Sequence, residues 1–269
     1  MVQVFKASLV QMTDPTPIIL ILPAYNEGVA LTPLLSMIAT IRAAHLHNLT
    51  VVVVDDGSTD DTVLVVRAAR SQNGNDSWLS LVSHPVNMGL AQAMRTGIAQ
   101  ALQTAPTDGL IASMDADNSH QPSEMVTMVN RISAGADIVI GSRFRVGAEM
   151  RGIPRHRQLF SVGVSILFQI FCPIRGVRDF SCGYRVYRAS ALREATAVFG
   201  EELITEQGFA CMTEVLLKMS RLPGLRFAET PICLRYDRKP GPTKMKVWQN
   251  VKDMMALMWR LRTGTMAAR

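Results

Sequence analysis

The stretch Gly109-Leu-Ile-Ala-Ser-Met-Asp-Ala-Asp117 joins a short apolar run to two aspartates that lie two residues apart. The apolar run has the composition of a buried β-strand, and Asp115 and Asp117 come where that strand should end. In open α/β sheets, ligands bind outside the carboxyl ends of the strands. Two carboxylates at such an end suit Mg²⁺ or Mn²⁺, which are usually shared with substrate phosphates. A solvated turn that carries two acidic residues is the alternative.

Other apolar runs alternate with segments of helical character on both sides of this stretch. The expected strands are residues 18–22, 51–54, 79–82, 110–114 and 138–140, and the expected helices are residues 31–46, 61–71, 89–103 and 122–133. Four consecutive valines at 51–54 are typical of a parallel strand that is buried on both faces. Strands that alternate with helices indicate right-handed βαβ units. The sequence therefore predicts an α/β protein with a mainly parallel sheet flanked by helices.

The charge of the chain is unevenly distributed. Residues 1–142 contain 6 Lys and Arg against 12 Asp and Glu, whereas residues 143–269 contain 22 against 10. An acidic half suits a metal site, and a basic half suits phosphates or an anionic membrane surface. Nucleic acid is not expected as a partner, because no aromatic residues interleave with the arginines and no helix-turn-helix or zinc-finger pattern is present.

The length and the cysteines indicate the setting of the protein. The chain has 269 residues, 48% of them hydrophobic, which suffices for one large domain with a substantial core. Four widely spaced cysteines without a C-x-x-C are typical of reduced thiols in the cytosol. We expect no signal peptide, and no transmembrane helix, because the apolar segment 159–174 is shorter than the roughly 20 residues that span a bilayer. This segment and a final helix over residues 245–261 would pack on the core or lie on a membrane.

Polar residues of distinct kinds follow the ends of the other expected strands. They are Tyr25, Glu27, Asp56 and Arg143. Tyr25 could stack on a base, and the two carboxylates could accept hydrogen bonds from a base or ribose. Arg143 could bind a phosphate in a bidentate manner. Taken singly, each has a structural alternative, such as a tight turn with Ser58 or Thr59 as a helix cap, or a surface salt bridge for Arg143.

Several segments in a fixed order carry a more specific signal. They are ILPAYNEG, VVVVDDGSTDDT, HPVNMGLAQAMRTGI, SMDADNSHQPSEM and IVIGSRF, followed by RHRQLFS, VRDFSCGYRVYRASAL and ETPICLRYDRKPGPTKMK. The first five resemble the inverting family 2 glycosyltransferases with the GT-A fold. The later ones resemble dolichol-phosphate mannose synthases and bacterial polyprenyl-phosphate sugar synthases. The resemblance implies a GT-A domain over residues 1–240, with an N-terminal extension at 1–17 and an acceptor segment at 143–183, and an amphipathic helical tail at 241–269.

The resemblance also implies an activity. The expected reaction transfers a hexose to a polyprenyl or dolichyl phosphate. Mannose is the first candidate for the hexose, and GDP-mannose for the donor. A family 2 transferase that uses a UDP-sugar and a glycan hydroxyl is the alternative. The implied partners are the nucleotide-diphosphate sugar, the lipid phosphate and, as in some relatives, a membrane-anchoring subunit. The implied location is cytoplasmic and peripheral, on the inner face of the membrane.

Site residues follow from the same resemblance. The nucleotide sugar would be bound by Pro23, Tyr25, Glu27, Asp56, Met114, Asp115, Ala116, Asp117, Arg235 and Lys244. The divalent metal, Mg²⁺ or Mn²⁺, would be held by Asp115, Asp117 and Ser119. Ser119 stands where many relatives have Gln, and Thr243 replaces the Ser of their R-x-x-G-x-S-K pattern. The acceptor phosphate would be bound by Arg143, Arg157 and Ser161, and the catalytic set is Asp115, Asp117, Arg143 and Asp179.

The acceptor decides whether a base is needed. A phosphate monoester has a second pKa of about 6, so it is already a nucleophile at neutral pH. A hydroxyl acceptor needs a carboxylate base, and Asp179 is the candidate for that role. The alternative for Asp179 is a structural cap or an ion pair with Arg185.

Overall fold

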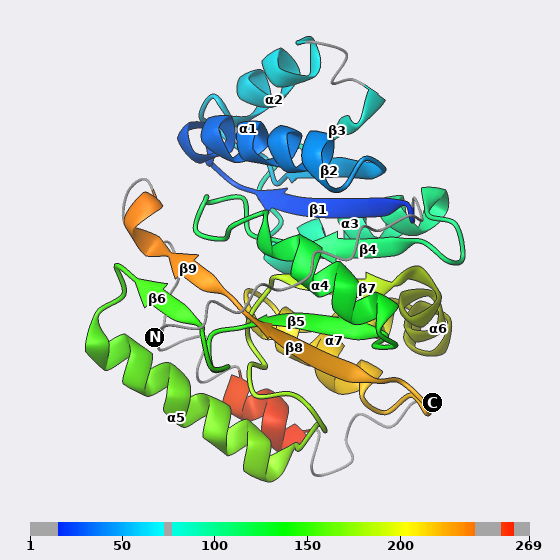
Figure 1. The fold of residues 1–269 in the computed structure, drawn as a ribbon, viewed down its shortest axis with the longest axis vertical. Helices are drawn as coiled ribbons and strands as arrows, with labels where there is room; N and C mark the ends of the chain where they lie inside the picture. Colours follow the sequence, from blue (N-terminus) through cyan, green and yellow to red (C-terminus); the bar gives the residue numbers. More distant parts are fainter. Residues whose placement is uncertain (1–15, 73–76, 240–253, 261–269) are drawn as a thin grey trace, which may run out of the picture.

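A seven-stranded sheet of order β3-β2-β1-β4-β7-β5-β8 forms the centre of the molecule (Figure 1). The computed structural model describes residues 16–72, 77–239 and 254–260. The strands are β1 (Ile18–Ala24), β2 (Leu49–Asp55), β3 (Leu79–Ser83), β4 (Leu110–Ser113), β5 (Ile138–Ser142), β7 (Arg185–Arg188) and β8 (Phe227–Pro231). All neighbours pair in parallel except β7, which is antiparallel to β4 and β5.

Helices cover both faces of this sheet (Figure 1). They are α1 (Gly28–Ala44), α2 (Thr62–Arg70), α3 (Leu90–Thr104), α4 (Glu124–Ser133), α5 (Arg155–Phe171), α6 (Ala189–Phe199) and α7 (Ala210–Met219), with 3₁₀ turns η2 (Gly200–Leu203) and η3 (Tyr236–Arg238). The prediction of an α/β protein with a mainly parallel sheet is confirmed. The four expected helices in the first half of the chain are present as α1 to α4.

Aliphatic side chains on both faces explain why the central strands form. In β1 and β2, Leu20, Ile21 and Val53 have no exposed surface, because helices pack on each side of the sheet. Strands β1, β2, β4 and β5 run in the same direction, β5 being related to β4 through the antiparallel β7. Their carboxyl ends therefore meet at one edge of the sheet, as the sequence predicted.

A second, two-stranded sheet lies beside that edge and was not predicted. It pairs β6 (Glu149–Arg151) with β9 (Cys233–Arg235) in parallel. The backbone N–H of Arg235 donates to the carbonyl of Ser119 over 2.7 Å. This bond fixes the end of β9, and the η3 turn that follows it, against the loop that carries the two aspartates.

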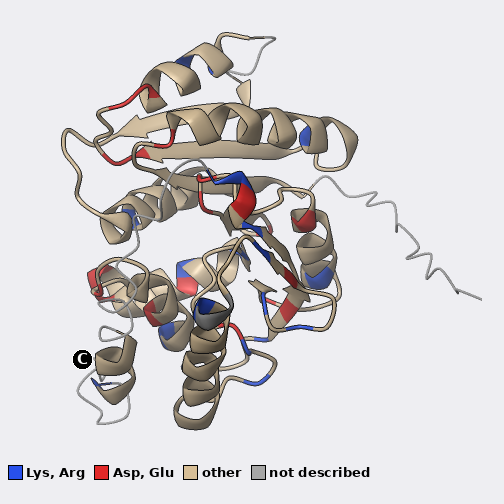
Figure 2. Ribbon diagram, turned by 90° about the vertical axis from the view of Figure 1, so that its left-hand side faces the viewer, with Lys and Arg blue, Asp and Glu red and all other residues tan. Residues whose placement is uncertain are grey.

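Helix α5 corresponds to the apolar segment for which the sequence left two roles open. Phe168 is fully buried, but Leu159, Val162, Ile166 and Ile170 are exposed, the first by 73%. These four positions recur at helical spacing, so they form one apolar stripe. Beyond its first turn α5 carries no charged residue (Figure 2). Within the described part of the chain, no helix has the length and apolar character to cross a membrane.

Only residues 254–260 of the expected final helix fall within the described residues, and they are helical. Met254, Leu257 and Met258 are buried, as expected for a core-facing side. Trp259, by contrast, is 68% exposed. It lies on the solvent side because it follows Met258 by one residue, a rotation of about 100° around a helix.

Gly57 allows two loops at the carboxyl edge to touch through their backbones. Its φ of +70° lies in the left-handed region. A Cβ at this position would stand 2.3 Å from the carbonyl carbon of Val86 and 2.6 Å from the nitrogen of Asn87. Glycine is therefore required both by backbone conformation and by space.

Gly57→Ala should lower the free energy of unfolding by about 1–3 kcal/mol from backbone strain, with the steric clash adding to it. Chemical denaturation measures the difference. Gly163→Ala is the control, because no atom lies within 4 Å of a Cβ placed there, and alanine is better than glycine in a helix by up to about 1 kcal/mol. Equal stability of the wild type and Gly57→Ala would contradict the described packing of the two loops.

Candidate active site at the carboxyl edge of the sheet

The loop after β4 turns the two aspartates to different surroundings. Met114 and Ala116 are buried, by 1% and 2% residual exposure, and act as apolar anchors on either side of Asp115. The Asp115 side chain is 27% exposed. Asp117 is nearly buried, and Asn118 that follows it has a φ of +62°. The left-handed residue ends the strand direction sharply, which keeps both carboxylates at the sheet edge.

Asp117 is engaged on both oxygens. Its Oδ1 accepts from the backbone N–H of Ser119 over 3.0 Å and from the Ser119 hydroxyl over 2.5 Å. Its Oδ2 accepts from the Nζ of Lys239 over 2.7 Å. Burial favours the neutral carboxyl, but the charge and hydrogen bond of Lys239 outweigh it, so the pKa of Asp117 lies below its ordinary value. The pKa of Lys239 is raised, since attraction to Asp117 outweighs the effect of burial.

Asp115 has a histidine as its neighbour. The Nε2 of His120 lies 3.4 Å from the Asp115 Oδ2. The imidazole packs on the ring of Tyr184 at 5.1 Å between centroids, and its Nδ1 is buried without a hydrogen-bond partner in the described part of the chain. One turn further, burial raises the pKa of Glu124 to about 7, against the lowering effects of a backbone hydrogen bond and of His120. His120 was not among the predicted site residues.

The residues present fit a divalent cation that is shared with a substrate. The donor set consists of oxygens only, from Asp115, Asp117 and Ser119. Among the described residues, no group of three or more His, Cys, Asp or Glu side chains gathers that could hold a metal by itself. A cation, the Lys239 ammonium, already sits against Asp117. Such a site suits a metal that takes its other ligands from phosphate oxygens and water. The Ser119 hydroxyl donates to Asp117 in this arrangement, so it orients that carboxylate.

Two cavities meet at Asp115. The larger one contains polar groups of Asp115, His120, Arg143, Ser161 and Ser181. Its apolar walls include Phe160, Val164, Phe209, Leu234 and Met254. The smaller cavity is lined by residues that include Pro23, Met114, Ser113 and Asp115. Asp115 and Gly183 border both, so a group bound to Asp115 can contact ligands on either side.

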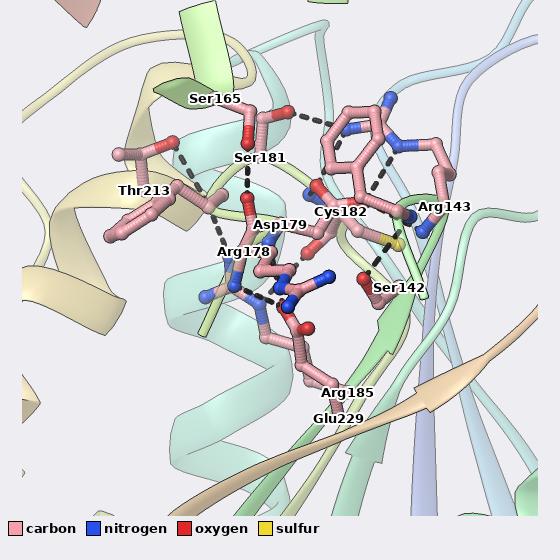
Figure 3. A network of polar contacts seen from close by, with 12 residues as sticks. Ser142, Arg143, Ser165, Arg178, Asp179, Ser181, Cys182, Arg185, Thr213 and Glu229 are labelled. Atoms are coloured by element: carbon pink, nitrogen blue, oxygen red, sulfur yellow. Dashed lines mark hydrogen bonds and ion pairs between the residues drawn. The ribbon is translucent and has the colours of Figure 1, made fainter. Parts of the chain in front are cut away.

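Arg143 forms a buried ion pair with Asp179 (Figure 3). Its Nε donates to Asp179 Oδ2 over 2.7 Å, and its Nη2 donates to Oδ1 over 2.6 Å and to the hydroxyl of Ser181 over 2.7 Å. An ion pair of Asp179 with Arg185, one of the structural alternatives considered above, is not formed. Arg185 donates instead to the carbonyl oxygens of Cys182, Met212 and Phe180. Arg185 is fully buried, and its guanidinium holds backbone carbonyls of the same loop, so the carboxylate of Asp179 is left to Arg143.

The surroundings of Asp179 do not suit a general base. The residue has no exposed surface. Burial raises its pKa, but the charge and hydrogen bonds of Arg143 dominate and hold that pKa below its ordinary value. The backbone N–H groups of Arg178 and Asp179 both donate to Glu229 over 2.6 Å, which fixes the loop (Figure 3). Asp179 therefore positions Arg143 and does not face a bound ligand.

The predicted acceptor residues are only partly brought together. Ser161 on α5 and Arg143 after β5 line the larger cavity. Arg157 lies one turn before Ser161 at the start of α5, half-buried, and is not a lining residue. Among the described residues, none forms an ion pair with its guanidinium, which lies at the N-terminal end of α5.

The predicted nucleoside residues surround the ends of β1 and β2. Tyr25 is 37% exposed, and Glu27 precedes α1, where its N–H donates to the hydroxyl of Thr62 over 2.9 Å. Asp56 is 3% exposed. Its oxygens accept from the ring nitrogen of His84 over 2.7 Å and from the N–H groups of Met88 and Gly89 over 2.9 and 2.7 Å. In this state Asp56 orders the loop between β3 and α3.

The helix cap expected from Ser58 or Thr59 is absent. Asp61 precedes α2 without a side-chain cap, and the N–H of Thr62 donates to Asp60 over 2.9 Å. The Ser58 hydroxyl accepts instead from the N–H of Asn26 over 2.9 Å. The residues expected to cap the helix thus join the loop after β2 to the loop after β1.

The basic residues after the last strand differ in where the structure places them. Arg235 forms an ion pair with Asp237 over 2.7 Å at the surface, while its backbone holds the Ser119 loop. Lys244 and Thr243 lie outside the described residues. Lys239, which contacts Asp117 directly, was not predicted, because nothing in the sequence distinguishes it from the other basic residues of this segment.

Comparison with known proteins agrees with these features. A family model described as Glycosyl transferase family 2 matches residues 19–196. An undecaprenyl-phosphate mannosyltransferase of Micrococcus luteus is 30% identical over 228 residues, which cover 85% of this chain and 87% of the relative. A polyprenol monophosphomannose synthase of Mycolicibacterium smegmatis is 27% identical over 237 residues, covering 88% and 83%.

Solved structures agree at the level of the fold. Glucosyl-3-phosphoglycerate synthase from Mycobacterium tuberculosis, in complex with Mn²⁺, UDP and glucosyl-3-phosphoglycerate, superposes with a TM-score of 0.64. The match covers 93% of this chain and 80% of that one, at 18% sequence identity.

Asp179→Asn should lower the free energy of unfolding by about 3 kcal/mol, because it leaves the buried Arg143 charge without its partner. Denaturant titration at pH 7 measures the loss. Glu149→Gln is the matched control, since the Arg151–Glu149 pair is exposed, by 55% and 52% of the side chains, and should cost no more than about 1 kcal/mol. Equal effects of the two substitutions would show that the Arg143–Asp179 pair is not formed.

Proposed function

Because the chain belongs to glycosyl transferase family 2, we propose that it transfers a hexose from a nucleotide-diphosphate sugar to the phosphate of a polyprenyl lipid. Mannose from GDP-mannose is the first candidate for the donor. It is supported by similar proteins named undecaprenyl-phosphate mannosyltransferase, polyprenol monophosphomannose synthase and dolichol-phosphate mannosyltransferase. For this reaction the GT-A sheet would provide the donor site at the ends of β1, β2 and β4.

The proposal of a lipid phosphate as the acceptor rests on the mixed polar and apolar lining of the larger cavity. It combines the cation Arg143 and the hydroxyl of Ser161 with walls made of Phe160, Val164 and other apolar side chains. A phosphate would bind the polar groups, while the start of an isoprenoid chain would contact the apolar ones. Arg157, which has no ion-pair partner in the described part of the chain, lies one helical turn from Ser161, where it would attract an anionic headgroup.

The reaction then needs no protein base. An oxygen of the ionised lipid phosphate attacks the anomeric carbon of the sugar, forming a new carbon–oxygen bond. The bond from that carbon to the β-phosphate oxygen breaks, and the nucleoside diphosphate leaves with the electron pair. Attack from the opposite side inverts the anomeric centre, as the family resemblance implies. Arg143 and Ser161 hold the nucleophile, and Asp179 keeps the Arg143 guanidinium in place.

Asp115 and Asp117, with Ser119 behind them, would hold Mg²⁺ or Mn²⁺ beside the donor diphosphate. When bound, the divalent cation would stabilise the negative charge that develops on the leaving diphosphate. Asp115 is suited to this position because it borders both cavities. Pro23, Tyr25, Glu27 and Asp56 would form the nucleoside side, and Arg235 and Lys244 the diphosphate side, as the resemblance implies.

The alternative acceptor, a glycan hydroxyl, is disfavoured by the state of Asp179. A base must be exposed to the hydroxyl that it deprotonates. Asp179 is fully buried and both of its oxygens are bonded to Arg143. Among the described residues that line the larger cavity, Asp115 is the only carboxylate, and it is assigned to the metal.

The exposed stripe of α5 supports a peripheral position at the cytoplasmic face of a membrane. Leu159, Val162, Ile166 and Ile170 face solvent on the helix that also lines the acceptor cavity. Insertion of this stripe into the headgroup region would bring Ser161 close to a lipid phosphate. A membrane-anchoring subunit, which the resemblance also implies, stays a prediction.

Purified protein with radiolabelled GDP-mannose, Mg²⁺ and undecaprenyl or dolichyl phosphate should give lipid-soluble label. Asp117→Ala should abolish this transfer without unfolding the protein, which circular dichroism checks. Arg157→Ala should raise the KM for the lipid phosphate by roughly tenfold, the effect of one hydrogen bond to a charged group.

Arg131→Ala, an exposed arginine on α4, controls for the loss of one positive charge. Absence of lipid-soluble label with GDP-mannose and with UDP-glucose, on either lipid phosphate, would contradict the proposed acceptor. Full activity of Asp117→Ala would contradict the metal assignment.

The double variant Leu159→Glu/Ile166→Glu should bind vesicles that contain anionic lipid about tenfold more weakly than the wild type, because it removes apolar contacts and adds repulsion. Vesicle flotation measures the bound fraction. Leu64→Glu/Val198→Glu is the matched control, since these side chains are exposed by 62% and 49% on other helices. Equal loss of binding in both double variants would contradict docking through α5.

A further inference from the structure

Lys239 occupies the side of Asp117 that a metal would use. Its Nζ lies 2.7 Å from the Asp117 Oδ2, while the Oδ1 is already bonded to Ser119. The ammonium also lies 5.7 Å from the centre of the Tyr236 ring, at the distance of a cation–π contact. The Lys239 ammonium thus has a defined position, in contact with a carboxylate and with the face of an aromatic ring.

The backbone of Lys239 is held in place by the η3 turn. Arg235 is fixed by its backbone bond to Ser119, and the N–H of Lys239 donates to the carbonyl of Tyr236 over 3.2 Å, closing η3. The Lys239 side chain therefore starts from a backbone held beside the aspartate loop, and it can leave Asp117 by rotating its own torsions. Nothing in the sheet has to move.

The surroundings keep Lys239 charged. The ammonium lies 2.7 Å from a carboxylate oxygen of Asp117, and the Lys239 side chain is 13% exposed. A lysine held against a carboxylate keeps its positive charge at neutral pH. A divalent cation bound to Asp117 Oδ2 would meet this like charge at very short range.

We propose that Lys239 is an internal competitor of the metal and thereby makes metal binding depend on the nucleotide. Without a nucleotide, Lys239 neutralises Asp117 and weakens the binding of a free divalent cation. A bound diphosphate supplies new oxygens that attract the ammonium away from Asp117 and at the same time provide ligands for the metal. Lys239 is then a positioning residue whose ammonium moves from Asp117 to the diphosphate. The binding of the metal and the binding of the donor therefore depend on each other. This inference rests on the metal site of the proposed function.

The test measures Mn²⁺ binding to the full-length protein by the loss of the free-ion electron paramagnetic resonance signal, with and without GDP or UDP. Without nucleotide, Lys239→Gln should bind Mn²⁺ about tenfold more tightly than the wild type, the effect of removing one hydrogen bond to a charged group. With nucleotide this advantage should disappear. Lys239→Arg keeps a cation near Asp117 and should resemble the wild type.

Arg238→Gln is the matched control for overall charge. Arg238 lies in the same turn and is exposed, and within the described part of the chain its side chain donates to the sulfur of Met37 at 4.0 Å. Its Mn²⁺ affinity without nucleotide should equal that of the wild type. Equal or weaker binding by Lys239→Gln, or equal tightening by Arg238→Gln, would overturn the competition.

Failure of the proposed function would look different. Wild-type protein that binds no Mn²⁺ even with GDP or UDP, or Asp117→Ala that binds it as well as the wild type, would overturn the metal site and the competition together. Nucleotide-dependent Mn²⁺ binding that is the same in Lys239→Gln and the wild type would leave the metal site standing and overturn only the role of Lys239.

Discussion

Compensation of buried negative charge at the carboxyl edge of the sheet is the constraint on which this structure depends. The ends of the parallel strands β2 and β4 bring Asp56 and Asp117 to one edge, and the loop before the antiparallel β7 adds Asp179; each has 7% exposure or less. A buried carboxylate without a partner would be strongly destabilising. Each of the three accordingly has its own donors: His84 and two backbone N–H groups, Lys239, and Arg143.

The three carboxylates differ in how easily another cation can replace their donors. This difference separates the carboxylates that order loops from the one that can bind a ligand. Backbone donors hold Asp56, and a bidentate arginine holds Asp179, so both order the loops around them. Asp117 is compensated by one flexible side chain that a different cation can replace. Asp115, at 27% side-chain exposure, lies between the two cavities. The exchangeable charge is therefore where the donor and acceptor sides meet.

The sequence predicted the repeating part of this arrangement and missed the part that long-range contacts decide. Runs such as Val51–Val54 identify the strands, and parallel strands have to place their carboxyl ends together, so the aspartate pair and Arg143 were found. The partner of Asp179 was misassigned, because Arg143 lies 36 residues away along the chain, whereas Arg185 donates its hydrogen bonds to backbone carbonyls. Lys239 lies 122 residues from Asp117, and its segment is brought to the site by the pairing of β6 with β9 and by the bond from Arg235 to Ser119.

The central claim is that the charge on Asp117 is exchangeable between Lys239 and a metal at the donor diphosphate. Anomalous X-ray diffraction from crystals grown with Mn²⁺ and a nucleoside diphosphate tests it most directly. We expect a manganese peak bound by Asp115 and Asp117, with the Lys239 ammonium moved from Asp117 to a phosphate oxygen. A manganese peak elsewhere, or a peak at Asp117 with Lys239 still 2.7 Å from its Oδ2 as in the present structure, would contradict it.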